Sequence, residues 1–130
     1  MPAPDRAIIF VYGTLKIGGS NHAQIADQHF LGPARTTPGF TLYSLAEYPG
    51  IVADPADRSG VAGELWAVDA TALARLDILE GVDEGLYARV PAPLSSWPES
   101  MAAAEAAQAS MYLYLRDLKD SPHLGYEWPI

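Results

Sequence analysis

The chain has 130 residues, of which 49% are apolar and 18% charged, a composition that suits a packed domain and excludes a disordered segment. Eight basic and sixteen acidic residues give a net charge of −8, and no run of basic residues could follow a phosphate backbone, so we expect no nucleic-acid partner. The absence of cysteine excludes a disulfide framework, thiolate metal ligands and thiol catalysis.

The first predicted strand covers residues 7–12, a nearly continuous apolar and β-branched run that stops at Gly13. Such a run is typical of a central strand that is buried on both faces. Residues 13–21 hold three glycines and end at Asn21, whose side chain is suited to cap a short helix over residues 22–27. The sequence therefore predicts a strand, a glycine loop and a helix in succession.

Three more strands are predicted, over residues 40–45, 50–53 and 61–68. Asp69 is then placed to cap a helix over residues 70–80, and Gly81 to end it in the left-handed conformation.

The region 91–109 has a different character, with three prolines and an alanine-rich stretch over residues 101–109 that predicts a short surface helix. Residues 110–115 return to strand alternation, which places Met111 on one side and Tyr112 on the other.

Glu80 breaks the apolar pattern of the predicted helix. Leu73, Leu76 and Glu80 are spaced by three and seven residues and therefore point the same way, so a carboxylate lies on the apolar face. Glu80 also falls in the last turn, where the helix dipole disfavours an anion. Burial and the dipole should both raise the pKa of Glu80, which favours a proton acceptor that works near neutral pH.

A structural role for Glu80 is the alternative, in which it reaches solvent at a frayed helix end or pairs with Arg75 or Arg89. The glycine loop favours the catalytic interpretation, because its bare N–H groups could bind a carboxylate or a developing oxyanion. Glu64, on a predicted strand, is a rival acidic candidate.

Several fragments, taken in their order and separation along the chain, resemble the γ-glutamylcyclotransferase family, most closely its short AIG2-like and γ-glutamylamine cyclotransferase branch. The likeness covers most of residues 8–90 and part of the C-terminal tail. The fragments are residues 10–15 (FVYGTL), 18–22 (GGSNH), 48–51 (YPGI), 61–65 (VAGEL) and 76–81 (LDILEG), with Tyr87, Arg89 and residues 125–128 (GYEW).

This resemblance implies an α+β fold, a compact mixed β-barrel with short flanking helices, as a single domain over residues 1–130. It implies an enzyme that cyclises a γ-glutamyl group to 5-oxoproline and releases an amine or amino acid, with no metal and no other cofactor. The implied site consists of Glu80 as general acid/base and of a substrate-binding set, Tyr12, Gly13, Thr14, Leu15, Tyr87 and Tyr112.

Asp83 and Glu84 follow Glu80 closely and add negative charge, which would disfavour acidic leaving groups or raise the pKa of Glu80 further. The alternative function is a non-catalytic module that binds γ-glutamyl or carboxylate ligands on the same fold, and a purely structural protein is a third possibility. Trp128 could close over the pocket.

The three histidines lack metal-ligand spacing, and His22 is best explained as a residue of a helix first turn. Residues 1–6 lack the apolar stretch of a signal peptide, and no window reaches the ~20 apolar residues of a membrane span. We therefore expect a cytoplasmic monomer or weak homodimer that acts on a small molecule and contacts no membrane.

Overall fold

The computed structural model describes residues 6–45, 47–118 and 120–129. The single domain predicted over residues 1–130 includes positions 1–5, 46, 119 and 130, which lie outside the described residues. No helix in the described part of the chain is long and apolar enough to cross a membrane.

The strands are β1 (Ala7–Val11), β2 (His29–Thr36), β3 (Phe40–Ser44), β4 (Pro49–Ala53), β5 (Ala62–Val68), β6 (Tyr87–Pro91), β7 (Leu94–Ser96), β8 (Ser110–Tyr114) and β9 (His123–Gly125). Two α-helices, α1 (Ala70–Leu79) and α2 (Ala103–Ala106), and one 3₁₀ helix, η1 (His22–Gln24), complete the described elements.

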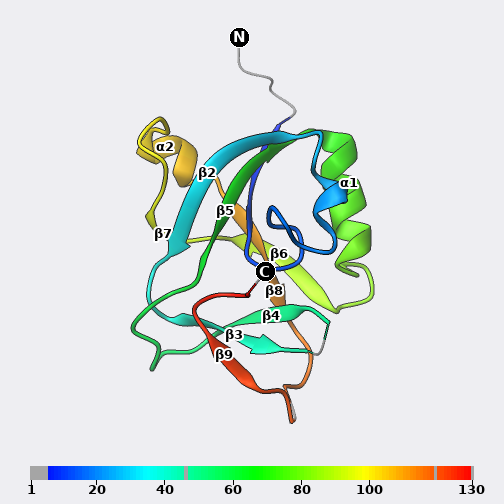
Figure 1. Cartoon of the computed structure of the whole chain (residues 1–130), viewed down its shortest axis with the longest axis vertical. Helices are drawn as coiled ribbons and strands as arrows, with labels where there is room; N and C mark the ends of the chain where they lie inside the picture. The colour runs from blue at the N-terminus through cyan, green and yellow to red at the C-terminus, as the bar shows by residue number, and fades with distance from the viewer. Residues whose placement is uncertain (1–5, 46, 119, 130) are drawn as a thin grey trace.

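One mixed sheet contains the nine described strands in the order β7-β2-β5-β1-β8-β4-β3-β9, and β6 pairs with β8 beside this path. β8 pairs in parallel with β1 and β4, whereas the other pairings are antiparallel. Figure 1 shows β2 and β5 bending strongly over the upper part of the molecule, with β3, β4 and β9 below. The predicted α+β class is confirmed, but the hydrogen-bonded path of described strands stays open and does not close into a barrel.

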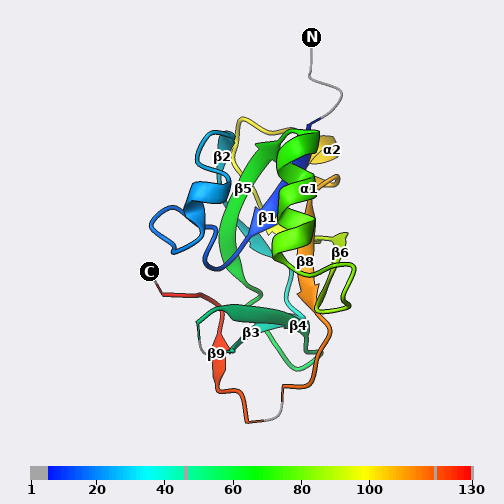
Figure 2. The same ribbon diagram turned by 90° about the vertical axis from the view of Figure 1, so that its right-hand side faces the viewer.

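Hydrophobic side chains pack on both faces of β1, as predicted for a central strand. Ile9 and Val11 belong to one buried cluster, with Leu76 of α1. Phe10 belongs to a second cluster, which reaches Ala106 of α2. Figure 2 shows α1 lying against the sheet in front of β1 and β8. The two clusters fix β1, and with it the start of the glycine loop, between two apolar layers.

Helix α1 begins and ends where the sequence predicts. The Asp69 side chain accepts a hydrogen bond of 2.8 Å from the Ala72 N–H, so it caps the helix as expected. Glu80 is the C-cap residue, and Gly81 follows with φ 62°, a left-handed conformation that glycine adopts without strain.

The predicted strands over residues 7–12, 40–45, 50–53, 61–68 and 110–115 are confirmed to within one residue at either end. The short helix expected within residues 101–109 is α2. Strands β2, β6, β7 and β9 are found in the structure and were not predicted from the sequence.

Candidate active site

A small cavity of about 190 Å³ opens where the glycine loop, the end of α1 and strands β6 and β8 meet. All seven residues predicted for the site line this one cavity, namely Tyr12, Gly13, Thr14, Leu15, Glu80, Tyr87 and Tyr112. The structure thus brings together residues from segments that lie up to 100 positions apart in the sequence, although their roles remain predictions.

The loop presents three backbone donors without internal partners. The N–H groups of Gly13, Thr14 and Leu15 donate to no acceptor among the described residues. The next residue ends this series, because the Lys16 N–H donates to the Gly13 carbonyl at 3.1 Å. Consecutive free N–H groups in a turn form a concave donor set that suits a carboxylate or an oxyanion.

Asn21 supports the loop but does not cap a helix, so the predicted capping role is wrong. The described side chain makes no capping hydrogen bond to the 3₁₀ helix η1. Its Nδ2 instead donates to Thr14 Oγ1 at 3.0 Å, and its backbone N–H donates to the Thr14 carbonyl at 2.9 Å. The helix predicted over residues 22–27 is the shorter η1, because Asn21 is committed to the loop.

Gly13 is required by close packing. A Cβ atom at this position would lie 2.5 Å from Pro49 Cγ and 2.8 Å from Pro49 Cδ, well inside van der Waals contact. Because Pro49 also lines the cavity, the loop and β4 can approach each other only without a side chain at residue 13.

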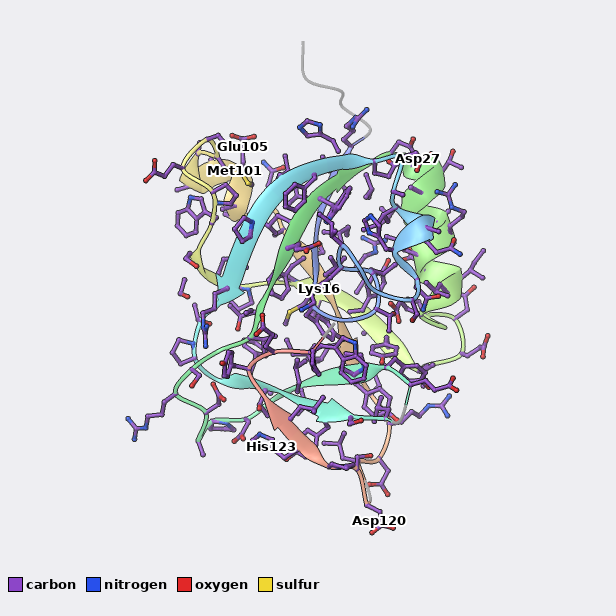
Figure 3. The ribbon with its side chains drawn as sticks, viewed as in Figure 1. Lys16, Asp27, Met101, Glu105, Asp120 and His123 are labelled. Atoms are coloured by element: carbon purple, nitrogen blue, oxygen red, sulfur yellow. The ribbon has the colours of Figure 1, made fainter. Side chains whose placement is uncertain are left out.

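One acidic and one basic side chain, those of Glu64 and Lys16, also hold the loop in place from outside the cavity. Glu64 Oε1 accepts hydrogen bonds of 3.1 Å from the Ile17 N–H and from Trp66 Nε1. Lys16, only 7% exposed, donates from Nζ to the Trp128 carbonyl at 2.9 Å. Figure 3 places Lys16 near the middle of the molecule.

These contacts show the roles of Glu64 and Trp128, which the sequence left open. Glu64 does not line the cavity and serves as an anchor of the loop. The Trp128 side chain does not line the cavity either, but packs against the cluster that contains Phe10, so it does not close over the pocket.

Glu80 lines the same cavity and directly follows the last residue of α1. Burial raises the pKa of this carboxyl group from its ordinary value of 4.5 to about 7. At that pKa, protonated and ionised forms coexist near neutral pH, as a group that both accepts and returns a proton requires.

No cation among the described residues pairs with Glu80, which contradicts the pairing with Arg75 or Arg89 that the structural alternative offered. Arg75 donates from Nη2 to the Gln24 carbonyl at 3.0 Å. Arg89 binds Asp77 through Nε at 3.0 Å and Nη2 at 3.2 Å. Both arginines are therefore engaged elsewhere, and the Glu80 carboxylate is left to face the cavity.

Three tyrosines complete the walls, and each donates its hydroxyl proton to the protein. The Tyr12 hydroxyl donates to the Tyr112 carbonyl at 2.6 Å, and the Tyr87 hydroxyl donates to the Pro49 carbonyl at 2.8 Å. The Tyr112 hydroxyl donates to Asp77 Oδ1 at 2.7 Å. Burial, followed by nearby negative groups including Glu80, raises the pKa of all three phenols, which stay neutral.

Other lining residues were not predicted as site residues. Asn21 had been assigned to a helix, while Tyr48, Pro49, Leu79 and Leu86 add mostly apolar surface to the cavity. Tyr48 and Leu79 are each 40% exposed. The short turn Tyr48-Pro49-Gly50 is the one signal in the sequence that could have indicated this part of the wall, because it already carried part of the family resemblance.

The mixed sheet of this α+β fold places the glycine loop and the Glu80 carboxyl group on one cavity. The family model described as gamma-glutamyl cyclotransferase, AIG2-like, matches residues 9–129, and the chain belongs to this family.

Relatives and solved structures agree with this assignment. A Vibrio cholerae relative named for the same family is 45% identical over 75 residues, 58% of this chain and 63% of that protein. The gamma-glutamylaminecyclotransferase of Rattus norvegicus is 40% identical over 82 residues, 58% of this chain and 55% of that protein. The chain thus spans less than two thirds of these curated relatives.

Among solved structures, an AIG2-like protein from Mus musculus has a TM-score of 0.72 at 27% identity, covering 94% of this chain and 88% of that chain. The protein ytfP from Escherichia coli has a TM-score of 0.64 at 30% identity, covering 93% of this chain and 94% of that chain.

Proposed function

We propose that this protein cyclises a γ-glutamyl group to 5-oxoproline and releases an amine or amino acid, with Glu80 as the general acid/base. The observation that carries the proposal is the Glu80 carboxyl group, with a pKa of about 7, on the same cavity as the amides of Gly13, Thr14 and Leu15. Neither the carboxyl group nor these amides have a hydrogen-bond partner among the described residues.

The free amides suit the substrate at two points. One part of the row can bind the α-carboxylate of the glutamyl group, and another can stabilise the oxyanion that forms on the side-chain carbonyl during attack. Among the described residues, no Lys or Arg side chain lines the cavity, so the backbone amides are the principal donors available to an anion there.

The reaction needs one proton acceptor. The neutral α-amine of the substrate attacks the side-chain carbonyl carbon to form the C–N bond of a five-membered ring, and Glu80 takes the proton that the α-nitrogen loses as this bond forms. The tetrahedral intermediate collapses, the original amide C–N bond breaks, and Glu80 returns its proton to the departing nitrogen. The products are 5-oxoproline and a free amine, with atoms and charge balanced.

Positioning supplies much of the rate. Both reacting atoms belong to the same glutamyl group, so a cavity that holds the chain folded makes the attack intramolecular. The small volume of the cavity supports this role, because it fits a glutamyl group better than an extended peptide.

The leaving group is best matched by an amine that carries no carboxylate next to the scissile bond. The lining offers the apolar surface of Tyr48, Leu79 and Leu86 but no described cationic side chain to pair with a second carboxylate. The exposed Asp83 and Glu84 near the end of α1 repel acidic groups in addition. The name of the rat relative, gamma-glutamylaminecyclotransferase, fits the same preference.

A panel of γ-glutamyl compounds tests the proposal. We expect 5-oxoproline from at least one compound, with γ-glutamyl derivatives of alkylamines preferred over γ-glutamyl-glutamate. Binding of these compounds without any 5-oxoproline would favour the non-catalytic binding module instead, and an absence of both binding and turnover would contradict both functions.

A further inference from the structure

Asp77 lies behind the cavity wall and organises one of its tyrosines. It belongs to α1, three residues before Glu80, and its Oδ1 accepts the Tyr112 hydroxyl proton at 2.7 Å. Arg89 of β6 holds the same carboxylate through two hydrogen bonds. Asp77 itself does not line the cavity, whereas Tyr112 does.

The bond to Asp77 fixes the polarity of the Tyr112 hydroxyl. A phenol has one proton to donate and lone pairs with which to accept. Because the proton is committed to a carboxylate, a charge-assisted and therefore strong hydrogen bond, the oxygen can act toward any further partner only as an acceptor.

Asp77 is kept ionised for this task. Its burial raises the pKa, but the hydrogen bonds from Arg89 and Tyr112 and the Arg89 charge outweigh that effect, so the pKa of Asp77 is lowered overall. The side chains of Arg89 and Asp77 are 36% and 29% exposed, so the pair is accessible to solvent on the side away from the cavity.

We propose that Asp77 is a positioning residue that makes Tyr112 an acceptor for the α-amino group of the bound substrate. A ligand held by the loop amides through its carboxylate still needs an acceptor for an N–H group of its α-amino group. Tyr112 and Glu80 line the same cavity, so the Tyr112 oxygen would meet that need beside the proposed base.

This inference rests on the proposed function for the identity of the ligand, but binding can test it without turnover. Two probes differ only at the α-carbon: L-glutamine, which is a γ-glutamyl amide with the α-amine, and glutaramic acid, which keeps the carboxylate and the amide but lacks the amine. Calorimetric dissociation constants for both probes separate recognition of the amine from the integrity of the pocket.

Asp77→Leu and Tyr112→Phe are the informative variants. Arg75→Met is the matched control on the same helix, since Arg75 donates to the Gln24 carbonyl and not to Asp77. We expect Asp77→Leu and Tyr112→Phe each to weaken L-glutamine binding by about 10-fold to 100-fold, the worth of a hydrogen bond to a charged group. Glutaramic acid binding by both variants, and L-glutamine binding by Arg75→Met, should stay within about threefold of wild type.

The double variant Asp77→Leu/Tyr112→Phe tests whether Asp77 acts through Tyr112. We expect it to bind L-glutamine no more weakly than Tyr112→Phe alone, because the acceptor is already absent. Multiplied effects in the double variant would overturn the proposal, as would a parallel loss of glutaramic acid binding, which a merely structural role predicts.

Asp77→Asn keeps the proposal testable if the leucine variant does not fold, because its amide oxygen can still accept from Tyr112. Asp77→Asn should bind L-glutamine more tightly than Asp77→Leu. If Asp77→Leu does not fold, Asp77→Asn should still bind L-glutamine more tightly than Tyr112→Phe, and weaker binding than Tyr112→Phe would contradict the mechanism. The variants could change L-glutamine binding as expected while the wild-type protein forms no 5-oxoproline from any compound of the panel. That result would contradict the proposed reaction but support the role of Asp77.

Discussion

Glu64 and Ile17 are joined by a hydrogen bond of 3.1 Å between the carboxylate and the backbone N–H, across 47 residues of sequence. The same Oε1 atom accepts from Trp66 Nε1, so one oxygen ties the outer part of the glycine loop to the middle of β5. An anchor of this kind needs an acceptor and does not need a charge.

Substitutions of Glu64 should therefore separate anchoring from acid/base chemistry. We expect Glu64→Gln to keep wild-type turnover within about threefold, because the amide oxygen can accept both bonds, and Glu64→Ala to raise KM by about 10-fold as two hydrogen bonds of ~1 kcal/mol each are lost. Steady-state kinetics on the best substrate of the panel would measure both. A Glu64→Gln variant that folds but loses turnover would instead make Glu64 the base.

Glu80→Gln preserves the shape of the side chain and removes its basicity. If Glu80 is the base, 5-oxoproline formation should fall by about 10²–10⁴-fold, the usual contribution of general acid–base catalysis. Binding of the glutaramic acid probe should survive, since the loop amides are untouched. A folded variant with wild-type turnover would refute the proposed role.

The pH dependence of activity follows from the same carboxyl group. With a pKa of about 7, kcat/KM should rise tenfold per pH unit below that value and level off above it. The Glu64→Gln variant is a suitable control, because the inflection should not move there. A flat profile between pH 5 and pH 8 would show that another group takes the proton.

Stability should respond to pH in the opposite sense. The pKa of Glu80 is about 7 in the folded state, above its ordinary value of 4.5, so the folded chain binds the proton more tightly. The resulting stability is fully present below pH ~4.5 and is lost as the pH rises through 7. The free energy of unfolding of Glu80→Gln, measured by thermal melts, should therefore increase relative to that of the wild type between pH 5 and pH 8, by on the order of 2–3 kcal/mol. A constant difference across this range would contradict the burial of Glu80.

Gly13→Ala should disturb the loop through a specific clash with Pro49, whose ring lies where the new methyl group would be. Overpacking of this kind destabilises by about 1–3 kcal/mol, and we expect KM to rise as the free amides shift. The double variant Gly13→Ala/Pro49→Ala removes the clashing ring atoms and should recover part of both losses relative to Pro49→Ala alone. An unchanged KM in the single variant would show that the loop is less constrained than its packing indicates.

The elements that sequence reasoning locates are those whose ends carry their own chemical signals. The helix α1 lies between Asp69, which caps it through its side chain, and Gly81, which has a positive φ, so both ends can be read from local rules. Strand β1 is equally predictable, because its apolar run stops at Gly13. The strand β2 is not, because Gly32 and Pro33 interrupt its pattern.

The structure explains how β2 tolerates those two residues. The register with β5 shifts between Phe30 and Gly32, and Gly32 has φ 138°, which marks a bulge. Pairing with β7 begins only at Arg35, so Pro33 is paired with β5 alone. Proline has no N–H group to donate, and at this position no second strand requires one.

The site, too, has features that the local sequence predicts and features that depend on long-range contacts. Glu80 can be found from its place on the helix, because the period of the apolar residues exposes the exception. The hydroxyl partners of the tyrosines cannot, since Tyr12 and Tyr87 donate to backbone carbonyls 100 and 38 residues away, and any residue offers a carbonyl. Asn21 is misread for a related reason, because its local capping signal is overridden by its contacts with Thr14.

The position of β8 in the sheet has a consequence for biosynthesis. This strand is the parallel partner of both β1 and β4 and the antiparallel partner of β6, yet it is translated after residue 109. A nascent chain that ends earlier leaves the Tyr12 hydroxyl without its carbonyl acceptor and Asp77 without Tyr112. Long-range pairing of this kind slows folding. The part of the cavity that Tyr112 lines can form only after β8 has been translated. We therefore expect the cavity to be completed late in folding, when β8 pairs with strands that were made long before it.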